Sequence, residues 1–240
     1  MLEAKYNCIL INPGEFWLRG KNRKMYFSSF KKHIVFLIKY VHKEKFNLKF
    51  DSERYILEST KPFEKTTIER LKKIPGVHSI HLVQKTSWDI KEIERAVLQV
   101  PGYEEAQNFC VRVKRANKKF EIGSVQFSKD LGHLVLTHYP HLKVKLKNPD
   151  LEVGIKIMDS GAFIDSGREY GVGGLPVGTT GKVVTLLSGG FDSSVASYFM
   201  SKRGCDQIFI FFHAYPFVGC LLYTSPSPRD QRGSRMPSSA

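Results

Sequence analysis

Apolar residues in the first third of the chain alternate between strand-like and helical spacing. A short apolar run ends at Pro13-Gly14, and Phe27, Phe30 and Ile34 then recur at the spacing that buries one face of a helix. Two alternating runs follow, joined by a turn at Asp51-Ser52. The predicted elements are strand 5–12, helix 22–43, strands 48–50 and 54–58, helix 62–73 and strand 76–82. This βαββαβ order predicts a ferredoxin-like α+β domain.

The middle of the chain continues the alternation of helical and strand-like patterns. Residues 109–115 alternate apolar and basic side chains, which predicts a half-exposed strand with Arg112 and Lys114 on one face. The other predicted elements are helices 89–100 and 124–139 and strands 144–146 and 151–158. A glycine-rich stretch, 167–181, then predicts a flexible connector.

An apolar strand over 183–187 leads into Ser188-Gly189-Gly190-Phe191-Asp192-Ser193 and an apolar helical segment. The glycines allow the backbone to approach a ligand closely, and the loop N–H groups with the helix N-terminus form a positive concavity suited to phosphate. Asp192 and Ser193 either cap this helix or hold a metal-bound pyrophosphate. The alternative is an ordinary strand-to-helix turn. The motif is neither a Walker loop nor a Rossmann fingerprint, and it resembles the pyrophosphate loop of ATP pyrophosphatases.

Charge and cysteine usage narrow the class of protein. The 240 residues carry a formal net charge of +14, which suggests a polyanionic partner such as nucleic acid; the alternative is a merely solvated lysine-rich surface. The four cysteines form no Cys-x-x-Cys pair and are expected to be reduced, buried thiols. Neither a signal peptide nor an apolar run of transmembrane length is evident, so a cytoplasmic protein without membrane contact is expected.

A basic stretch follows the predicted strand over 109–115. Residues 112–119 place lysine and arginine side chains beside Phe109 and Phe120, a combination that suits an RNA-backbone groove. The alternative is a solvated strand face.

Six segments, taken in order, resemble the bacterial and archaeal tRNA 4-thiouridine synthetase family, the tRNA sulfurtransferases also tied to thiamine biosynthesis. The segments are GE at 14–15, GKNRK at 20–24, VRVKRANK at 111–118, LKNPD at 146–150, GGLPVG at 173–178 and LSGGFDS at 187–193. The resemblance covers about residues 5–219 in collinear pieces.

The resemblance implies an α+β ferredoxin-like domain, an α/β THUMP domain that binds RNA, and the start of a parallel α/β ATP-pyrophosphatase domain. The expected boundaries are 1–62 for the first domain, with packing extending as far as 83, 63–168 for THUMP, 169–182 for a linker and 183–219 for the pyrophosphate-loop domain. Residues 220–240 are expected to be a non-native tail, because they look like a translated sequencing adapter; the alternative is a natural disordered basic tail.

The resemblance also implies chemistry. ATP and Mg²⁺ serve to adenylate the 4-oxygen of uridine 8 in tRNA, and a persulfide sulfur from a cysteine desulfurase then displaces AMP. The nucleotide-binding residues implied are Leu186, Leu187, Ser188, Gly189, Gly190, Asp192, Ser193, Phe211 and Phe212. The candidate RNA-binding residues are Lys21, Arg23, Lys24, Arg112, Lys114, Arg115, Lys118 and Lys119. No protein metal site is predicted. The thiamine sulfur-carrier protein is a further implied partner, and a homodimer stays open.

No catalytic cysteine is assigned, because the family's persulfide cysteines and its downstream ATP ligands fall beyond the matched segments. The chain is therefore expected to be an incomplete enzyme. Two other hypotheses stay open: a stand-alone tRNA-binding module, and a different pyrophosphate-loop enzyme that adenylates a small molecule. The basic N-terminal half argues against the second of these.

Overall fold

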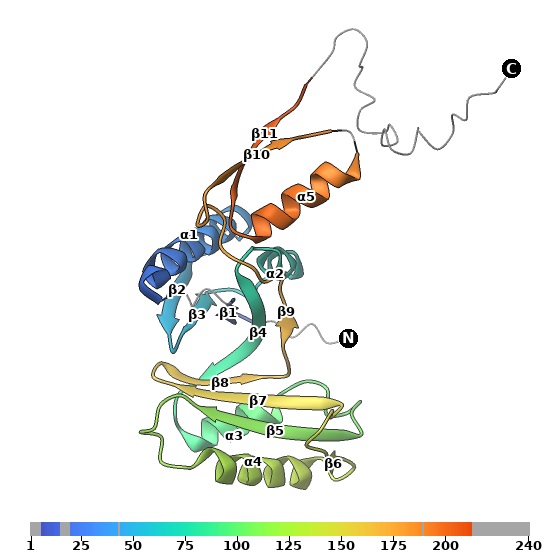
Figure 1. The fold of residues 1–240 in the computed structure, drawn as a ribbon. Helices are drawn as coiled ribbons and strands as arrows, with labels where there is room; N and C mark the ends of the chain where they lie inside the picture. The colour runs from blue at the N-terminus through green and yellow to red at the C-terminus, as the bar shows by residue number, and fades with distance from the viewer. Residues whose placement is uncertain (1–5, 15–19, 43, 189, 213–240) are drawn as a thin grey trace, which may run out of the picture.

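A computed structural model of the chain describes residues 6–14, 20–42, 44–188 and 190–212. Most of these residues belong to one twisted sheet flanked by helices, and a smaller two-stranded unit follows (Figure 1). The large sheet has the strand order β2-β3-β1-β4-β8-β7-β5-β6, with β9 paired to β4. Within the described residues, no helix is both long and apolar enough to cross a membrane.

The N-terminal part of the sheet has the predicted ferredoxin-like order. Its elements are β1 (Cys8–Pro13), a 3-10 turn (Gly20–Asn22), α1 (Arg23–Val41), β2 (Phe46–Asp51), β3 (Arg54–Ser59), α2 (Lys65–Lys72) and β4 (Val77–Thr86). Each neighbouring pair in β2-β3-β1-β4 is antiparallel. The helical spacing of Phe30, Ile34 and Ile38 buries one face of α1 against β1 and β3. This confirms the α+β prediction for the first domain.

The first domain's core includes residues beyond position 62. Phe63, Leu71, Ile74, Val77 and Ile80 belong to the same buried cluster as the inward face of α1. The segment through β4 is therefore part of the first structural unit, as the expected packing toward residue 83 would require.

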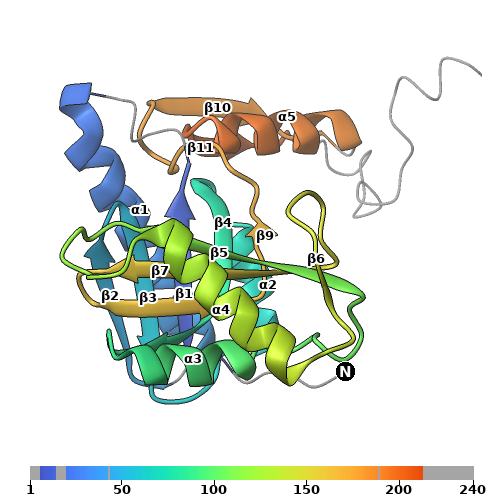
Figure 2. The same ribbon diagram turned by 90° about the horizontal axis from the view of Figure 1, so that it is seen from below.

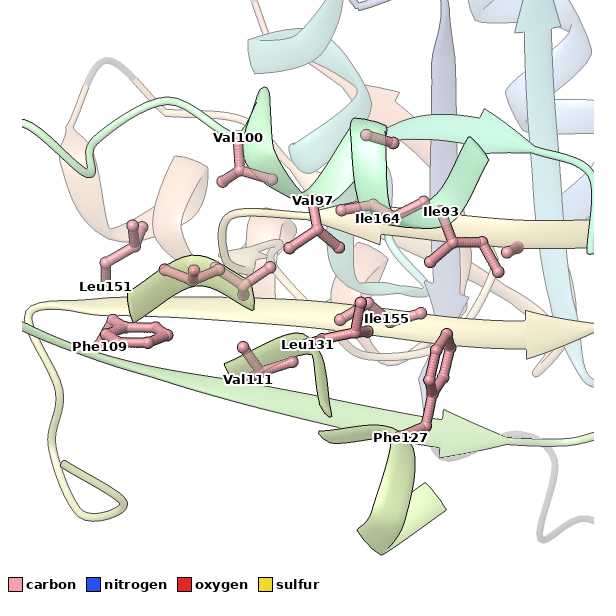
Figure 3. Close-up of a cluster of buried hydrophobic side chains, with 14 of the residues drawn as sticks. Ile93, Val97, Val100, Phe109, Val111, Phe127, Leu131, Leu151, Ile155 and Ile164 are labelled. Carbon is pink, nitrogen blue, oxygen red and sulfur yellow. The ribbon is translucent and has the colours of Figure 1, made fainter. Parts of the chain in front are cut away.

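The second part of the sheet has two helices of its own, and both pack on one face of it. Its elements are α3 (Ile90–Leu98), β5 (Asn108–Arg115), α4 (Ser124–His138), β6 (Lys143–Val144), β7 (Leu151–Met158) and β8 (Gly161–Asp165). Figure 3 shows side chains of α3 and α4, such as Val97 and Phe127, gathered over Val111 and Ile155 of the strands. Strand β5 pairs in parallel with β7, so this part is mixed α/β.

A strand that the sequence pattern did not predict joins the two parts. Strand β8 pairs antiparallel with β7 on one side and with β4 on the other. In Figure 1, β4 curves downward toward β8, whereas β5, β7 and β8 run nearly horizontally, so the sheet twists strongly at this junction. Asp51 adds a second link by accepting hydrogen bonds from the backbone and hydroxyl of Ser160, at 3.1 and 2.6 Å. The two domains thus share one continuous sheet.

The glycine-rich segment is packed, which differs from the expected flexible connector. After β9 (Glu169–Tyr170), the Gly173 N–H donates to the Val77 carbonyl at 2.7 Å and the Leu175 N–H donates to the Lys202 carbonyl at 2.9 Å. Gly174 has φ +80°, and a Cβ there would collide with the Lys202 carbonyl oxygen. In this strap, residues 171–181, Gly171 and Gly174 are needed for close backbone approach, because a Cβ at either position would collide with a backbone oxygen.

The third unit consists of β10 (Lys182–Leu186), α5 (Phe191–Lys202) and β11 (Asp206–Ile210). The two strands pair in parallel and form a separate sheet. In Figures 1 and 2 this unit lies beyond α1 and α2, on the side away from α3 and α4. The structure therefore has the predicted strand, loop, helix and strand of a parallel α/β domain.

Candidate nucleotide and nucleic-acid sites

The two parallel strands of the third unit bring the candidate nucleotide-binding residues to one edge. Leu186 lies opposite Ile210, and the Leu187 N–H donates to the Ile210 carbonyl at 2.8 Å. Phe211 and Phe212 follow directly after β11. Because parallel strands end at the same edge of a sheet, the loop after β10 and this aromatic pair are neighbours, and ligands bind at this kind of edge in α/β proteins.

The loop between β10 and α5 is organised by two serines. The Ser188 N–H donates to the Ser193 hydroxyl oxygen at 3.2 Å, and the two hydroxyls lie 3.1 Å apart. The Gly190 N–H donates to the Ser188 hydroxyl oxygen at 3.3 Å. These contacts fold the loop back over the first turn of α5, so that Ser188 and Ser193 fix its shape.

The N-terminus of α5 suits an anion. Gly190 is the N-cap residue, is buried, and offers no side chain to cap the helix. A helix N-terminus of this kind presents backbone N–H groups and the positive end of the helix dipole. The arrangement therefore fits a phosphate group held by backbone donors, with the Ser193 hydroxyl beside it.

Apolar surface flanks this anion site. Leu186 is 60% exposed and Phe212 is 77% exposed, so both offer uncovered apolar surface at the edge of the site. The structure thus brings Leu186, Leu187, Ser188, Gly190, Asp192 and Ser193 together with Phe211 and Phe212, while Gly189 lies outside the described residues.

Among the residues that the structure describes, no group of three or more His, Cys, Asp or Glu side chains could hold a metal ion. Near the loop, the exposed carboxylate of Asp192 lies in the first turn of α5. A magnesium ion there would rely mostly on phosphate oxygens and water, which is the usual coordination of Mg²⁺ with nucleotides.

The candidate RNA-binding residues separate into two groups. Three arginines make contacts within the protein: Arg23 pairs with Glu53 at 2.7 Å, and Arg112 pairs with Glu152 at 2.8 Å. Arg115 donates to the carbonyls of Phe120 and Ile122, at 2.7 and 3.2 Å. It therefore closes the loop after β5.

The candidate lysines are more accessible. Lys24, Lys114, Lys118 and Lys119 are exposed, whereas the side chain of Lys21 lies outside the described residues. Lys114 is set apart from the other three by its place beside Lys156 on the neighbouring strand. The spacing of residues 112–119 alone did not separate accessible cations from those that stabilise the loop.

Three cysteines lie within the described residues, and all of them are buried and free. Burial raises the pKa of Cys8 to about 12, and burial also raises the pKa of Cys110. Thiols in this state are poor nucleophiles at neutral pH, because the thiolate is the reactive form. Cys8 and Cys110 therefore fit a structural role, and Cys205 is buried beside the Thr180 hydroxyl, 3.4 Å from its sulfur.

Three family models match the chain in sequence order. The ThiI ferredoxin-like domain matches residues 8–81, the THUMP domain matches residues 88–165, and the thiamine biosynthesis protein (ThiI) model matches residues 178–221. Together they cover most of the large sheet, its helices and the nucleotide loop. The chain belongs to the ThiI family.

Relatives of this ThiI-family chain carry an enzyme name. A probable tRNA sulfurtransferase of Caldanaerobacter subterraneus subsp. tengcongensis is 36% identical over 212 residues, which are 88% of this chain and 54% of that protein. A probable tRNA sulfurtransferase of Thermoanaerobacter sp. is 36% identical over 225 residues, 93% of this chain and 56% of that protein. The chain thus spans about half the length of the curated relatives it matches.

Solved structures agree with the fold. A 4-thiouridine synthetase, solved as an RNA complex with bound ATP, has a TM-score of 0.77 at 30% identity, over 91% of this chain and 56% of that one. A Pyrococcus horikoshii protein has a TM-score of 0.76 at 24% identity, over 87% of this chain and 69% of that one, and shows the fold alone. The expected order along the chain, a ferredoxin-like fold, a THUMP fold and the start of a pyrophosphatase-type fold, is confirmed.

Proposed function

We propose that this chain is the tRNA-binding part, together with the beginning of the ATP-binding part, of an enzyme that converts uridine 8 of tRNA to 4-thiouridine. The observation that carries the proposal is the Ser188–Ser193 loop at the carboxyl edge of two parallel strands, following a ferredoxin-like and THUMP sheet in one chain. The named relatives and the RNA complex with ATP support the same activity.

In this proposal the loop and α5 bind and orient the nucleotide. Backbone N–H groups at the start of α5 and the hydroxyls of Ser188 and Ser193 hold the pyrophosphate, with Mg²⁺ near Asp192. Leu186, Leu187, Phe211 and Phe212 contact the adenosine through apolar surface. ATP supplies an adenylyl group that turns the 4-oxygen of the uridine into a leaving group.

Sulfur comes from outside the described residues. The terminal sulfur of a persulfide derived from a cysteine desulfurase attacks C4 and displaces AMP. A second cysteine thiol then forms a disulfide with the carrier cysteine and leaves the sulfur on the uridine. The same sulfur relay serves the thiamine sulfur-carrier protein, and the reaction takes place in the cytoplasm, with a homodimer as a compatible assembly. The cysteines of the described residues are all buried, which fits a sulfur relay that uses cysteines outside them.

The alternative function is a stand-alone tRNA-binding module without catalysis. The packing of the chain supports this alternative. The ferredoxin-like and THUMP domains have complete buried cores. In contrast, β10, α5 and β11 expose Phe199, Phe209 and Ile210 among other apolar side chains. In this alternative, the fully packed ferredoxin-like and THUMP domains bind tRNA without the nucleotide unit.

A thiolation assay distinguishes the two. The purified chain is incubated with unmodified tRNA, ATP, Mg²⁺, cysteine and a cysteine desulfurase, and thiolated tRNA is detected by its retardation in an organomercury gel. We expect tRNA binding without thiolation from this chain, and thiolation from a protein of the relatives' full length that carries the same loop. Loss of thiolation in that longer protein on Ser193→Ala, with tRNA binding retained, supports the assigned role of the loop. Full activity of the variant would contradict it.

A further inference from the structure

A cleft of about 290 Å³ lies at the junction of the ferredoxin-like and THUMP domains. Four cationic side chains line it: Arg54 from β3, Lys114 from β5, Lys156 from β7 and Arg168 from the segment before β9. The first two come from different domains, and the β4–β8 pairing fixes those domains against each other. The cleft is therefore a product of the shared sheet.

The cleft opens on the face of the sheet that carries no helix. Lys114 and Lys156 are register partners on β5 and β7, so their side chains project to the same face. The adjacent residues Ile155 and Ile157 point the other way and pack in the cluster under α3 and α4. On this face Lys114 is exposed, whereas Lys156 is buried next to a cluster that Met158 and Phe163 form with Leu10 and Ile56 of the first domain.

A buried network fixes the floor of the cleft. The Lys156 ammonium is 2.5 Å from the Asp165 carboxylate, and His81 Nδ1 lies 3.2 Å from the same carboxylate oxygen. His81 Nδ1 is also 3.0 Å from the Gly167 carbonyl oxygen, so this nitrogen carries the proton and Nε2 remains for the cleft that His81 lines. Gly154 leaves room for Asp165, because a Cβ at that position would lie 2.8 Å from Asp165 Oδ1.

Positive charge exceeds negative charge here. Of the acidic residues at the cleft, Asp165 is bound to Lys156 and Glu53 is paired with Arg23 at 2.7 Å. Within the described part of the chain, Arg54, Lys114 and Arg168 have no carboxylate at ion-pair distance; Arg54 donates to the Met158 sulfur and Arg168 lies over the Tyr170 ring. Burial lowers the pKa of Arg54; the nearby carboxylates of Glu53, Asp165 and Asp51 oppose this shift, and the charge of Arg168 adds to it.

The chemistry of the lining favours phosphate. Two guanidinium groups, two ammonium groups and the hydroxyls of Ser52 and Ser79 surround the space. Guanidinium groups match phosphate oxygens with paired N–H donors. The lining contains no Phe, Tyr or Trp ring on which a base could stack, so the backbone of a nucleic acid fits better than its bases.

We propose that this cleft binds a backbone phosphate of the RNA and holds it across the junction of the two domains. The inference rests on the proposed function and adds to it a specific contact, made by Arg54, Lys114 and Arg168 over the buried Lys156. The contact shares Lys114 with the groove expected over 112–119, but it does not use Arg112 or Arg115, which are engaged within the protein.

The test compares two double variants of the 240-residue chain that remove equal charge. Lys114→Ala/Arg168→Ala removes two exposed cations at the cleft, and Lys31→Ala/Lys32→Ala removes two exposed cations on α1. Affinity for an in vitro transcribed tRNA is measured over a range of salt concentrations. We expect the cleft variant to bind about tenfold more weakly for each contact removed, with a salt slope smaller by about two, and the α1 variant to bind like the unsubstituted chain.

Phosphate-ethylation interference then identifies the contact. Ethylation of one or a few phosphates should block binding of the unsubstituted chain and lose its effect in Lys114→Ala/Arg168→Ala. Equal affinities and equal salt slopes for the two double variants would overturn the proposed phosphate contact in the cleft but leave the proposed function intact. Absence of tRNA binding by the unsubstituted chain would overturn both. Competition by poly-glutamate as effective as that by tRNA would overturn the assignment to RNA phosphate.

Discussion

The shared sheet and the nucleotide unit of this chain differ in how their apolar residues are used. In the sheet, two helix-covered clusters bury residues such as Phe30 and Phe127 almost completely. In the unit formed by β10, α5 and β11, Phe199, Phe209 and Ile210 remain exposed, and among its described residues only Gly190, Ser197, Gly204 and Cys205 are buried. A parallel strand gains stability from cover on both faces. The sheet is thus a complete scaffold, whereas the nucleotide unit has the local structure of a site without a core of its own.

The largest effect should come from matched truncations in the two regions. Phe109 in β5 is 0% exposed, and Phe209 in β11 is 55% exposed. Phe109→Ala should lower the free energy of unfolding by about 3–5 kcal/mol, because it removes a buried ring and leaves a cavity. Phe209→Ala should change it by less than about 1 kcal/mol. Urea unfolding followed by circular dichroism measures both, and similar losses would break the comparison.

The buried ion pair at the domain junction should give the next effect. Asp165→Asn leaves the Lys156 ammonium buried without its 2.5 Å partner, which should cost about 3 kcal/mol. Adding Lys156→Met should recover most of this loss, because the uncompensated charge is removed with its partner. If the double variant is no more stable than Asp165→Asn in urea unfolding, then the ion pair is not the source of the loss.

The same pair gives a pH dependence with a defined sign. Burial alone would raise the pKa of Asp165, but the hydrogen bond from His81 and the charge of Lys156 outweigh it and lower that pKa. The stability that Asp165 contributes is therefore fully present above its unfolded pKa of about 3.9 and is lost as pH falls through the lower folded value. Acid unfolding of the unsubstituted chain should show this loss, and the Asp165→Asn/Lys156→Met variant should lack it.

A smaller effect is expected where the two regions meet. Gly174 and Gly178 both have positive φ, at +80° and +82°, but only a Cβ at Gly174 would meet the Lys202 backbone. Gly178→Ala should cost about 1 kcal/mol for its backbone conformation, and Gly174→Ala should cost about 1–3 kcal/mol more because the strap must move away from α5. Equal effects in thermal unfolding would show that the strap does not hold α5 to the sheet.

The smallest effect separates two basic residues that the sequence pattern grouped together. Arg115 donates to two loop carbonyls, whereas Lys118 is exposed. Arg115→Ala should lower the free energy of unfolding by about 1–2 kcal/mol, and Lys118→Ala should stay within about 0.5 kcal/mol. A larger loss for Lys118→Ala in urea unfolding would contradict the assignment of Arg115 as the residue that closes the loop.

Local patterns predicted the individual elements well. The helical spacing of Phe30, Ile34 and Ile38 defined the inward face of α1, and the apolar run over 151–158 became β7 with the expected bounds. Strand β8 was missed because it has only five residues and begins with a glycine, so its apolar pattern is too short to predict a strand. Its signal was the two-residue turn Asp159-Ser160 before Gly161, between two apolar runs.

The cleft could not be predicted, because it depends on pairing between distant segments. Arg54, His81, Lys156 and Arg168 are brought together only when β8 joins β4 to β7. The one local signal was Lys156, a lysine within an apolar strand, where a buried charge requires a partner. By contrast, the nucleotide loop is contiguous in sequence, so its residues could be identified before the fold was known.

Native-state hydrogen exchange of the chain tests most directly the claim that a complete sheet carries a nucleotide unit with little core of its own. We expect amides of β1, β4 and β7 to exchange only through global unfolding, and amides of β10, α5 and β11 to exchange through local opening at a much lower free energy. This result would place the stable platform for RNA in the ferredoxin-like and THUMP domains. Equal protection of β10 and β4 would contradict the account, because it would show that the nucleotide unit shares the stability of the sheet.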